Sequence, residues 1–64
     1  MNVKLRAARE KTGKTQRQVA REAGITEVSY QRIEYDLQRP SLTTALRIAK
    51  ALNETVEQLF NAEK

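Results

Sequence analysis

The sequence predicts an all-α fold, a compact domain of five short helices. Two observations carry this prediction: apolar residues recur at the spacing of helix faces, and residues that cap or end helices separate these stretches. No stretch alternates apolar and polar residues as a strand would, and none is of low complexity. Because 64 residues leave room for one core, we expect residues 1–64 to form a single domain.

The first helix is expected from about Asn2 to Lys11. Asn2 is a suitable N-cap, and Gly13 is a natural residue to end the helix. Its apolar positions are Val3, Leu5 and Ala8.

Two short helices with a tight turn between them are predicted around Gly24. Thr15 would cap the first, which ends just before the glycine, and Gly24 would supply the positive φ of the turn. Thr26 would cap the second, which runs to about Tyr35. Since neither helix is long enough to be stable alone, the two must pack together. The sequence therefore predicts a helix-turn-helix with its core at residues 16–35.

A fourth helix is expected after the loop that ends at Pro40, which cannot continue a preceding helix. Ser41 or Thr43 would open this helix, and Asn53, which tolerates left-handed geometry, would end it.

A fifth short helix would begin at Thr55, which forms a capping box with Gln58. This helix bears the apolar residues Val56, Leu59 and Phe60 and is too short to bury all of them. A partner molecule would explain this patch, and the alternative is that Leu59 and Phe60 close the base of the core.

The connections between helices span two to six residues, so the helices must fold back on one another around one core. The residues expected in that core are Leu5, Ala8, Val19, Ala20, Ala23, Ile25, Tyr30, Ile33, Leu42, Ala45, Leu46, Ala49 and Leu52.

Charge is distributed unevenly along the chain. The net charge is +4, and residues 1–21 carry seven basic side chains against one acidic, whereas residues 22–64 carry five against seven. A basic first third indicates a polyanionic partner, with a solvated helix face as the alternative.

Composition narrows the class of protein. Cysteine and histidine are both absent, which excludes disulfides, thiol chemistry and the usual transition-metal ligands. With no glycine-rich phosphate loop and too little volume for a cleft, we expect no catalytic residues, no cofactor and no metal, and therefore not an enzyme. No run of apolar residues is long enough to span a membrane, and we expect a cytoplasmic protein.

The chain resembles the phage repressor and Cro-type helix-turn-helix domains, the Xre family, from about Leu5 to Phe60. The resemblance rests on the segments TQRQVAREAGIT, Ile33-Glu34, RPSLTTALRIAKAL and TVEQLF. In register with the family pattern are Gln16, Ala20, Gly24, Glu34 and Pro40-Ser41-Leu42. The resemblance implies a lambda repressor-like DNA-binding domain from a bacterium or phage, located at the nucleoid.

Two positions depart from the family pattern. Tyr35-Asp36 stands where Asn-Gly is usual, so we expect a turn with mild strain at Asp36. Tyr30 replaces a common aliphatic residue, and we expect its hydroxyl to reach a partner or solvent.

In such folds the third helix lies in the major groove of DNA. The residues on it that would read bases are Glu27, Val28, Ser29, Gln31 and Arg32. Arg32 would bond guanine, Gln31 adenine, and Val28 a thymine methyl group. The alternative for Arg32 is a solvated or phosphate-bound arginine. Glu27 would accept from a cytosine amine, or would only favour the helix dipole at its N-terminal position.

A second set of residues would hold DNA phosphates, chiefly Gln16 at the start of the second helix. The full set is Lys14, Gln16, Arg17, Thr26, Tyr35, Gln38 and Arg39. For Arg17 and Arg21 the alternative is plain solvation, which we prefer for Arg21. Phosphate contacts fix position and salt dependence but carry no sequence preference, so Gln16→Ala should weaken all sites alike.

The resemblance also implies an internal ion pair between Arg9 and Glu34, and dimerisation through Val56, Leu59 and Phe60. A two-fold dimer would read a palindromic operator on double-stranded DNA and act as a repressor. The alternative is an antitoxin-like module that neutralises a protein partner and regulates its own operon. No small-molecule ligand is evident.

Overall fold

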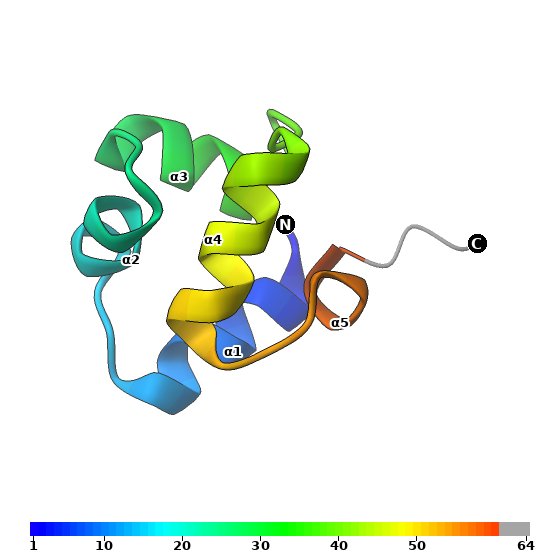
Figure 1. The fold of residues 1–64 in the computed structure, drawn as a ribbon. Coiled ribbons are helices and arrows are strands. Elements are labelled where there is room, and N and C mark those ends of the chain that lie inside the picture. The colour runs from blue at the N-terminus through cyan, green and yellow to red at the C-terminus, as the bar shows by residue number, and fades with distance from the viewer. Residues whose placement is uncertain (61–64) are drawn as a thin grey trace.

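The computed structural model describes residues 1–60, and in this part of the chain five helices and no strands are present (Figure 1). In chain order the helices are α1 (Val3–Thr12), α2 (Gln16–Ala23), α3 (Glu27–Glu34), α4 (Leu42–Leu52) and α5 (Val56–Phe60). The predicted all-α fold of five helices is therefore confirmed.

Each helix begins at a residue whose side chain satisfies a free backbone N–H group. The Asn2 carboxamide accepts from the Leu5 N–H at 3.0 Å, and Ser41 accepts from the Thr44 N–H at 3.1 Å. Thr26 caps α3 in the same way. Capping boxes open α2 and α5, formed by Thr15 with Gln18 and by Thr55 with Gln58. The choice between Ser41 and Thr43 is thus settled for Ser41.

The predicted stop residues adopt left-handed backbone geometry. Gly24 has φ +75° between α2 and α3, and a Cβ atom there would also lie 3.2 Å from an Arg47 guanidinium nitrogen. Asn53 ends α4 with φ +57°. Asp36 has φ +63°, so the turn after α3 keeps its left-handed residue although glycine is replaced.

The helix α4 runs through the middle of the domain (Figure 1). It packs against α2 on one side and against α5 and α1 on the other, while α3 packs mainly on α2. The turn at Gly24 therefore sets α3 at the edge of the domain, with one side in the core and the other facing outward.

The predicted core is wrong at two leucines of α4. Leu42 is 71% exposed and Leu46 is 54% exposed. The helix instead turns Ala45, Ile48, Ala49 and Leu52 inward, which leaves Leu42 and Leu46 at the side of this stripe without a covering helix. Ile48, Ala51 and Leu59 complete the core in their place, and Ile25 is only half-buried against it.

The Tyr30 side chain is fully buried, and the expectation for its hydroxyl is wrong. Among the described residues the hydroxyl makes no hydrogen bond of normal geometry and does not reach solvent, although it lies beside the charged groups of Glu34 and Arg9. Burial raises the pKa of Tyr30, and the nearby charge of Glu34 raises it further, so the hydroxyl stays neutral.

Replacing Tyr30 with phenylalanine is expected to stabilise the fold by about 1 kcal/mol. The substitution keeps the ring and removes a polar atom that is buried without a partner. Urea unfolding of the wild type and Tyr30→Phe measures the difference. A loss of more than about 1 kcal/mol would show that the hydroxyl makes a stabilising hydrogen bond after all.

Candidate nucleic-acid interface

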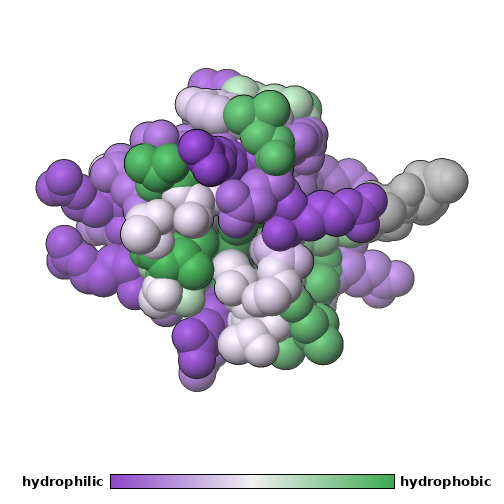
Figure 2. All heavy atoms as spheres, turned by 90° about the horizontal axis from the view of Figure 1, so that it is seen from above, coloured by the Kyte–Doolittle hydropathy of each residue, from purple (hydrophilic) through white to green (hydrophobic). Residues whose placement is uncertain are grey.

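The outward side of α3 carries polar and apolar side chains together. Val28 is 56% exposed although it is aliphatic, and Arg32 is exposed one turn further along the helix. Glu27, Ser29 and Gln31 are half-exposed beside them. Viewed from above, the molecule presents hydrophobic side chains interspersed with hydrophilic ones (Figure 2). A surface with donors, acceptors and a methyl-bearing side chain matches the chemistry of base edges in a major groove.

The Arg32 side chain has no partner in the described part of the protein. Among residues 1–60 its guanidinium makes no hydrogen bond and no ion pair, whereas Arg6, Arg9 and Arg17 each lie near a carboxylate. The fork of donors on Arg32 is therefore available to a ligand.

Glu27 and Arg17 face each other across the turn. The Arg17 Nε lies 3.6 Å from a Glu27 carboxylate oxygen, and both side chains are well exposed. Such an exposed pair contributes about 0–1 kcal/mol, so either side chain is free to turn to another partner.

The N-terminal end of α2 lies against α3 through Gln16. The Gln16 amide donates to Glu34 Oε2 at 3.2 Å, and its carbonyl oxygen accepts from Gln31 at 3.3 Å. These contacts could not be predicted from the sequence, because Gln16 is 18 positions from Glu34 and 15 positions from Gln31. A candidate phosphate-binding side chain and a candidate base-reading side chain are thus joined.

A buried ion pair lies beneath this surface. Arg9 Nε lies 2.9 Å from Glu34 Oε1, and the Arg9 Nη2 donates to Oε2 at 3.2 Å. Glu34 is fully buried, whereas 15% of the Arg9 side chain is exposed. Hydrogen bonding to Glu34 raises the pKa of Arg9 above its ordinary value. The pair connects α1 to the C-terminal end of α3 and so fixes the position of α3.

The Lys14 side chain has partners within the protein, so its predicted phosphate contact stays a prediction. Its ammonium group donates to Glu22 at 2.8 Å and to the Ala51 carbonyl at 2.7 Å. It thus stabilises the C-terminal turn of α4, where carbonyl groups lack helix partners. These two bonds hold the Lys14 charge on α4 and away from α3.

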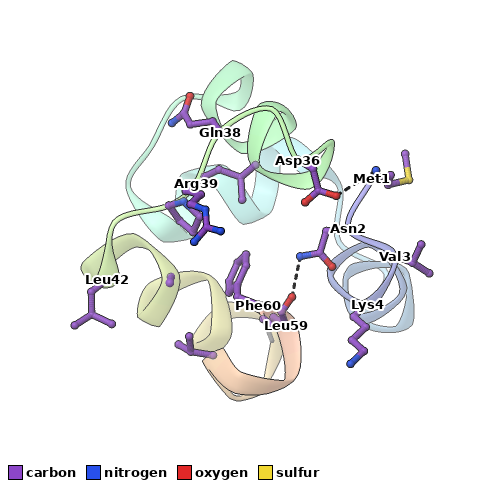
Figure 3. A pocket seen from close by; sticks show the side chains of 14 residues that line it. Met1, Asn2, Val3, Lys4, Asp36, Gln38, Arg39, Leu42, Leu59 and Phe60 are labelled. Carbon is purple, nitrogen blue, oxygen red and sulfur yellow. Dashed lines mark hydrogen bonds and ion pairs between the residues drawn. The ribbon is translucent and has the colours of Figure 1, made fainter. Parts of the chain in front are cut away.

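The remaining phosphate candidates lie at the ends of α3. Thr26, Tyr35, Gln38 and Arg39 are exposed, and the Thr26 hydroxyl also caps α3. Gln38 and Arg39 both line a pocket of about 750 Å3 between the loop, α1, α4 and α5, and Figure 3 shows the Arg39 side chain directed into the pocket and the Gln38 amide turned away from it.

The three apolar residues of α5, which are Val56, Leu59 and Phe60, differ in burial. Leu59 is only 2% exposed, so it belongs to the core and is not available to a second molecule. Val56 and Phe60 are half-buried, and Phe60 points into the pocket that Arg39 also enters (Figure 3). The assignment of Leu59 to an interface is therefore corrected, and it closes the base of the core instead.

The fold defines a class of protein: a small helical domain in which α2, the turn at Gly24 and α3 form a helix-turn-helix. The comparison with protein families agrees, since the model described as Helix-turn-helix matches residues 5–59. The chain belongs to this family of Xre and lambda repressor-like helix-turn-helix domains, and the family marks a DNA-binding transcription regulator. No curated protein and no solved structure matches the chain.

Within residues 1–60 no helix is long and apolar enough to cross a membrane. The same residues contain no cluster of three potential metal-ligating side chains.

Proposed function

We propose that this protein is a transcriptional repressor that binds a palindromic operator as a homodimer, with α3 of each subunit in the major groove. The observation that carries the proposal is the set of side chains on the outward side of α3. Val28 and Arg32 are exposed there and lie beside Glu27 and Gln31. This set offers a partner for each kind of group on a base edge. Repression would follow from occupation of a promoter by the dimer, in the cytoplasm at the nucleoid.

Phosphate contacts would come from both ends of the helix-turn-helix. Gln16 and Arg17 lie at the start of α2, where free backbone N–H groups and the helix dipole favour an anion. Gln38 would contact the backbone on the other side of α3. Binding would weaken steeply with salt, because each neutralised phosphate releases counterions.

Selection of bound oligonucleotides from a random double-stranded pool tests the proposal. We expect a two-fold symmetric sequence whose half-sites lie roughly 34 Å, one helical turn, apart. A single unrepeated half-site would support DNA reading but contradict the dimer. Enrichment of no sequence would contradict the proposed function and favour a protein-binding module such as an antitoxin.

The dimer would use a surface that we call the α4–α5 face: Leu42, Leu46, Val56 and Phe60. Leu42 and Leu46 lie one helical turn apart and are both exposed, and Leu42, Val56 and Phe60 line the same pocket. Exposed leucines of this kind form the apolar centre of homodimer interfaces. A second copy of the chain would cover them about a two-fold axis.

Leu46→Lys is expected to weaken dimerisation at least about tenfold, since burying a leucine contributes roughly 1.5–3 kcal/mol and the dimer contains two copies. Sedimentation velocity at about tens of micromolar should show a wild-type dimer and a monomeric variant. Val28→Lys, which changes an exposed aliphatic residue on α3, is the matched control and should remain a dimer. A monomeric wild type would contradict the dimer, and a dimeric Leu46→Lys would exclude this face.

A further inference from the structure

Three side chains form a chain of hydrogen bonds from the buried ion pair to the surface of α3. The Gln16 Nε2 donates to Glu34 Oε2 at 3.2 Å, and the Gln31 Nε2 donates to Gln16 Oε1 at 3.3 Å. We call Glu34, Gln16 and Gln31 the amide relay. It begins at a fully buried carboxylate and ends at a half-exposed side chain.

Each link of the relay fixes the direction of the next. The Glu34 carboxylate, paired with Arg9 at 2.9 Å, can only accept hydrogen bonds. The amino end of the Gln16 amide must therefore face Glu34, which turns its carbonyl oxygen toward Gln31. That oxygen requires a donor, so the amino end of Gln31 must face Gln16.

The direction of Gln31 determines what it presents to a ligand. Among residues 1–60 its carbonyl oxygen accepts no hydrogen bond, and one of its two N–H groups remains unused. An amide with a free oxygen and a free N–H is complementary to adenine, which presents the N6 donor beside the N7 acceptor. Guanine presents two acceptors, because its O6 stands where adenine has the N6 donor. To bind guanine, the Gln31 amide would have to turn over and place its N–H groups where its carbonyl oxygen now lies.

We propose that the amide relay holds Gln31 in the direction that reads adenine, with Glu34 and Gln16 as positioning residues. If the Gln31 amide turned over to bind guanine, its carbonyl oxygen would face the carbonyl oxygen of Gln16. The hydrogen bond between the two side chains would then be lost. This inference rests on the proposed function, because it assigns a base preference to a helix that must first lie in a major groove. It gives Gln16 a role in sequence preference in addition to its phosphate contact.

The two roles of Gln16 predict different results. A lost phosphate contact weakens every DNA sequence by the same factor. A lost relay weakens the preference at one base pair and leaves the others unchanged. We therefore compare each variant's dissociation constants on two operators that differ only at that base pair. A phosphate contact changes both constants by the same factor, which cancels in their ratio.

The experiment uses the operator selected by the wild type and a set in which each base pair is changed in turn. Gln31→Met identifies the base pair that Gln31 contacts, since its preference should disappear there. At that base pair we expect the wild type to favour adenine over guanine by at least about tenfold. Fluorescence anisotropy should show this ratio falling to about threefold or less in Gln16→Met, with ratios elsewhere unchanged. Gln38→Met makes the same chemical change at a proposed phosphate contact outside the relay, so it should weaken all operators by one common factor and keep every ratio.

Several outcomes would overturn the inference. One is a Gln16→Met variant that weakens all operators by one common factor, and another is a guanine preference at the Gln31 base pair. A Gln31→Met variant with all preferences intact would also overturn it, while leaving the proposed function standing. Circular dichroism shows that each variant is folded, and Gln16→Ala replaces Gln16→Met if the latter is not. If the wild type selects no DNA sequence, the proposed function itself fails.

Discussion

Replacing Arg9 with methionine is expected to lower the free energy of unfolding by about 3–5 kcal/mol. The substitution leaves the Glu34 carboxylate fully buried, with only the Gln16 amide still donating to it. A domain of 64 residues has a total stability of about 3–10 kcal/mol, so the loss would unfold much of the population. Urea or thermal unfolding followed by circular dichroism at 222 nm, the standard helix signal, measures the effect.

The double variant Arg9→Met/Glu34→Leu is expected to be more stable than Arg9→Met alone. Removing both charges leaves apolar side chains in a site that is already largely buried, and no buried group is left unpaired. Gln16 would lose an acceptor, but it is half-exposed and can bond to water. The comparison therefore separates the cost of a lone buried charge from the contribution of the pair.

The matched control is the exposed ion pair on α1. Arg6 and Glu10 lie 3.1 Å apart, with side chains 49% and 57% exposed. Arg6→Met should change stability by less than about 0.5 kcal/mol, because water replaces the lost partner. If Arg9→Met, the double variant and Arg6→Met were all equally mild, the Arg9–Glu34 pair would have no role in holding α3.

Local features of the fold could be predicted because they depend on a few adjacent residues. Thr55 and Gln58 form the expected capping box, and Asn53 and Gly24 adopt the expected left-handed geometry. A cap or a stop needs only its own helix end, which the sequence shows directly.

The errors arose where burial depends on a neighbouring element. The apolar stripe of α4 is wider than the surface that α1, α2 and α5 cover, so periodicity placed Leu42 and Leu46 inside. The internal partners of Lys14, which are Glu22 and the end of α4, could likewise not be predicted from its charge and position in the chain. The Tyr30 side chain is fully buried, hydroxyl included. Burying its ring in the core stabilises the fold by more than burying one unpaired hydroxyl costs.

The candidate site could be predicted in part. The outward residues of α3 follow from helical spacing once Tyr30 and Ile33 are placed inside, and both are buried. The amide relay could not be predicted, because it depends on the side-chain directions of Gln16 and Gln31 after α2 and α3 have packed. Sequence spacing identifies the side chains that face outward but leaves open how their donors and acceptors are oriented.

Arg32→Ala is expected to weaken binding to the selected operator by about 1–3 kcal/mol and to remove the preference at one base pair. The Arg32 guanidinium is exposed and makes no bond within residues 1–60, so its donors can all go to guanine O6 and N7. Because the side chain packs against nothing in the core, the loss should appear in DNA binding. Stability should change by about 1 kcal/mol at most, which is the effect of one cation in the last turn of a helix.

Two other arginines on α2 separate base reading from general charge. Arg17→Ala removes a candidate phosphate contact and should weaken all operators alike, with the slope of log K against log salt smaller by about one. Arg21→Ala removes the same charge from an exposed position that we expect to be solvated. It should change the base preference less than Arg32→Ala does, and the salt slope less than Arg17→Ala does.

Competition titrations with operators changed at single base pairs distinguish these results. A position-specific loss in Arg32→Ala together with a uniform loss in Arg17→Ala would place α3 in the groove and the start of α2 on the backbone. If Arg32→Ala kept every base preference and lost only salt dependence, Arg32 would be a phosphate ligand. The preference would then have to come from Gln31, Val28 and Glu27, and α3 would lie shallower in the groove than we propose.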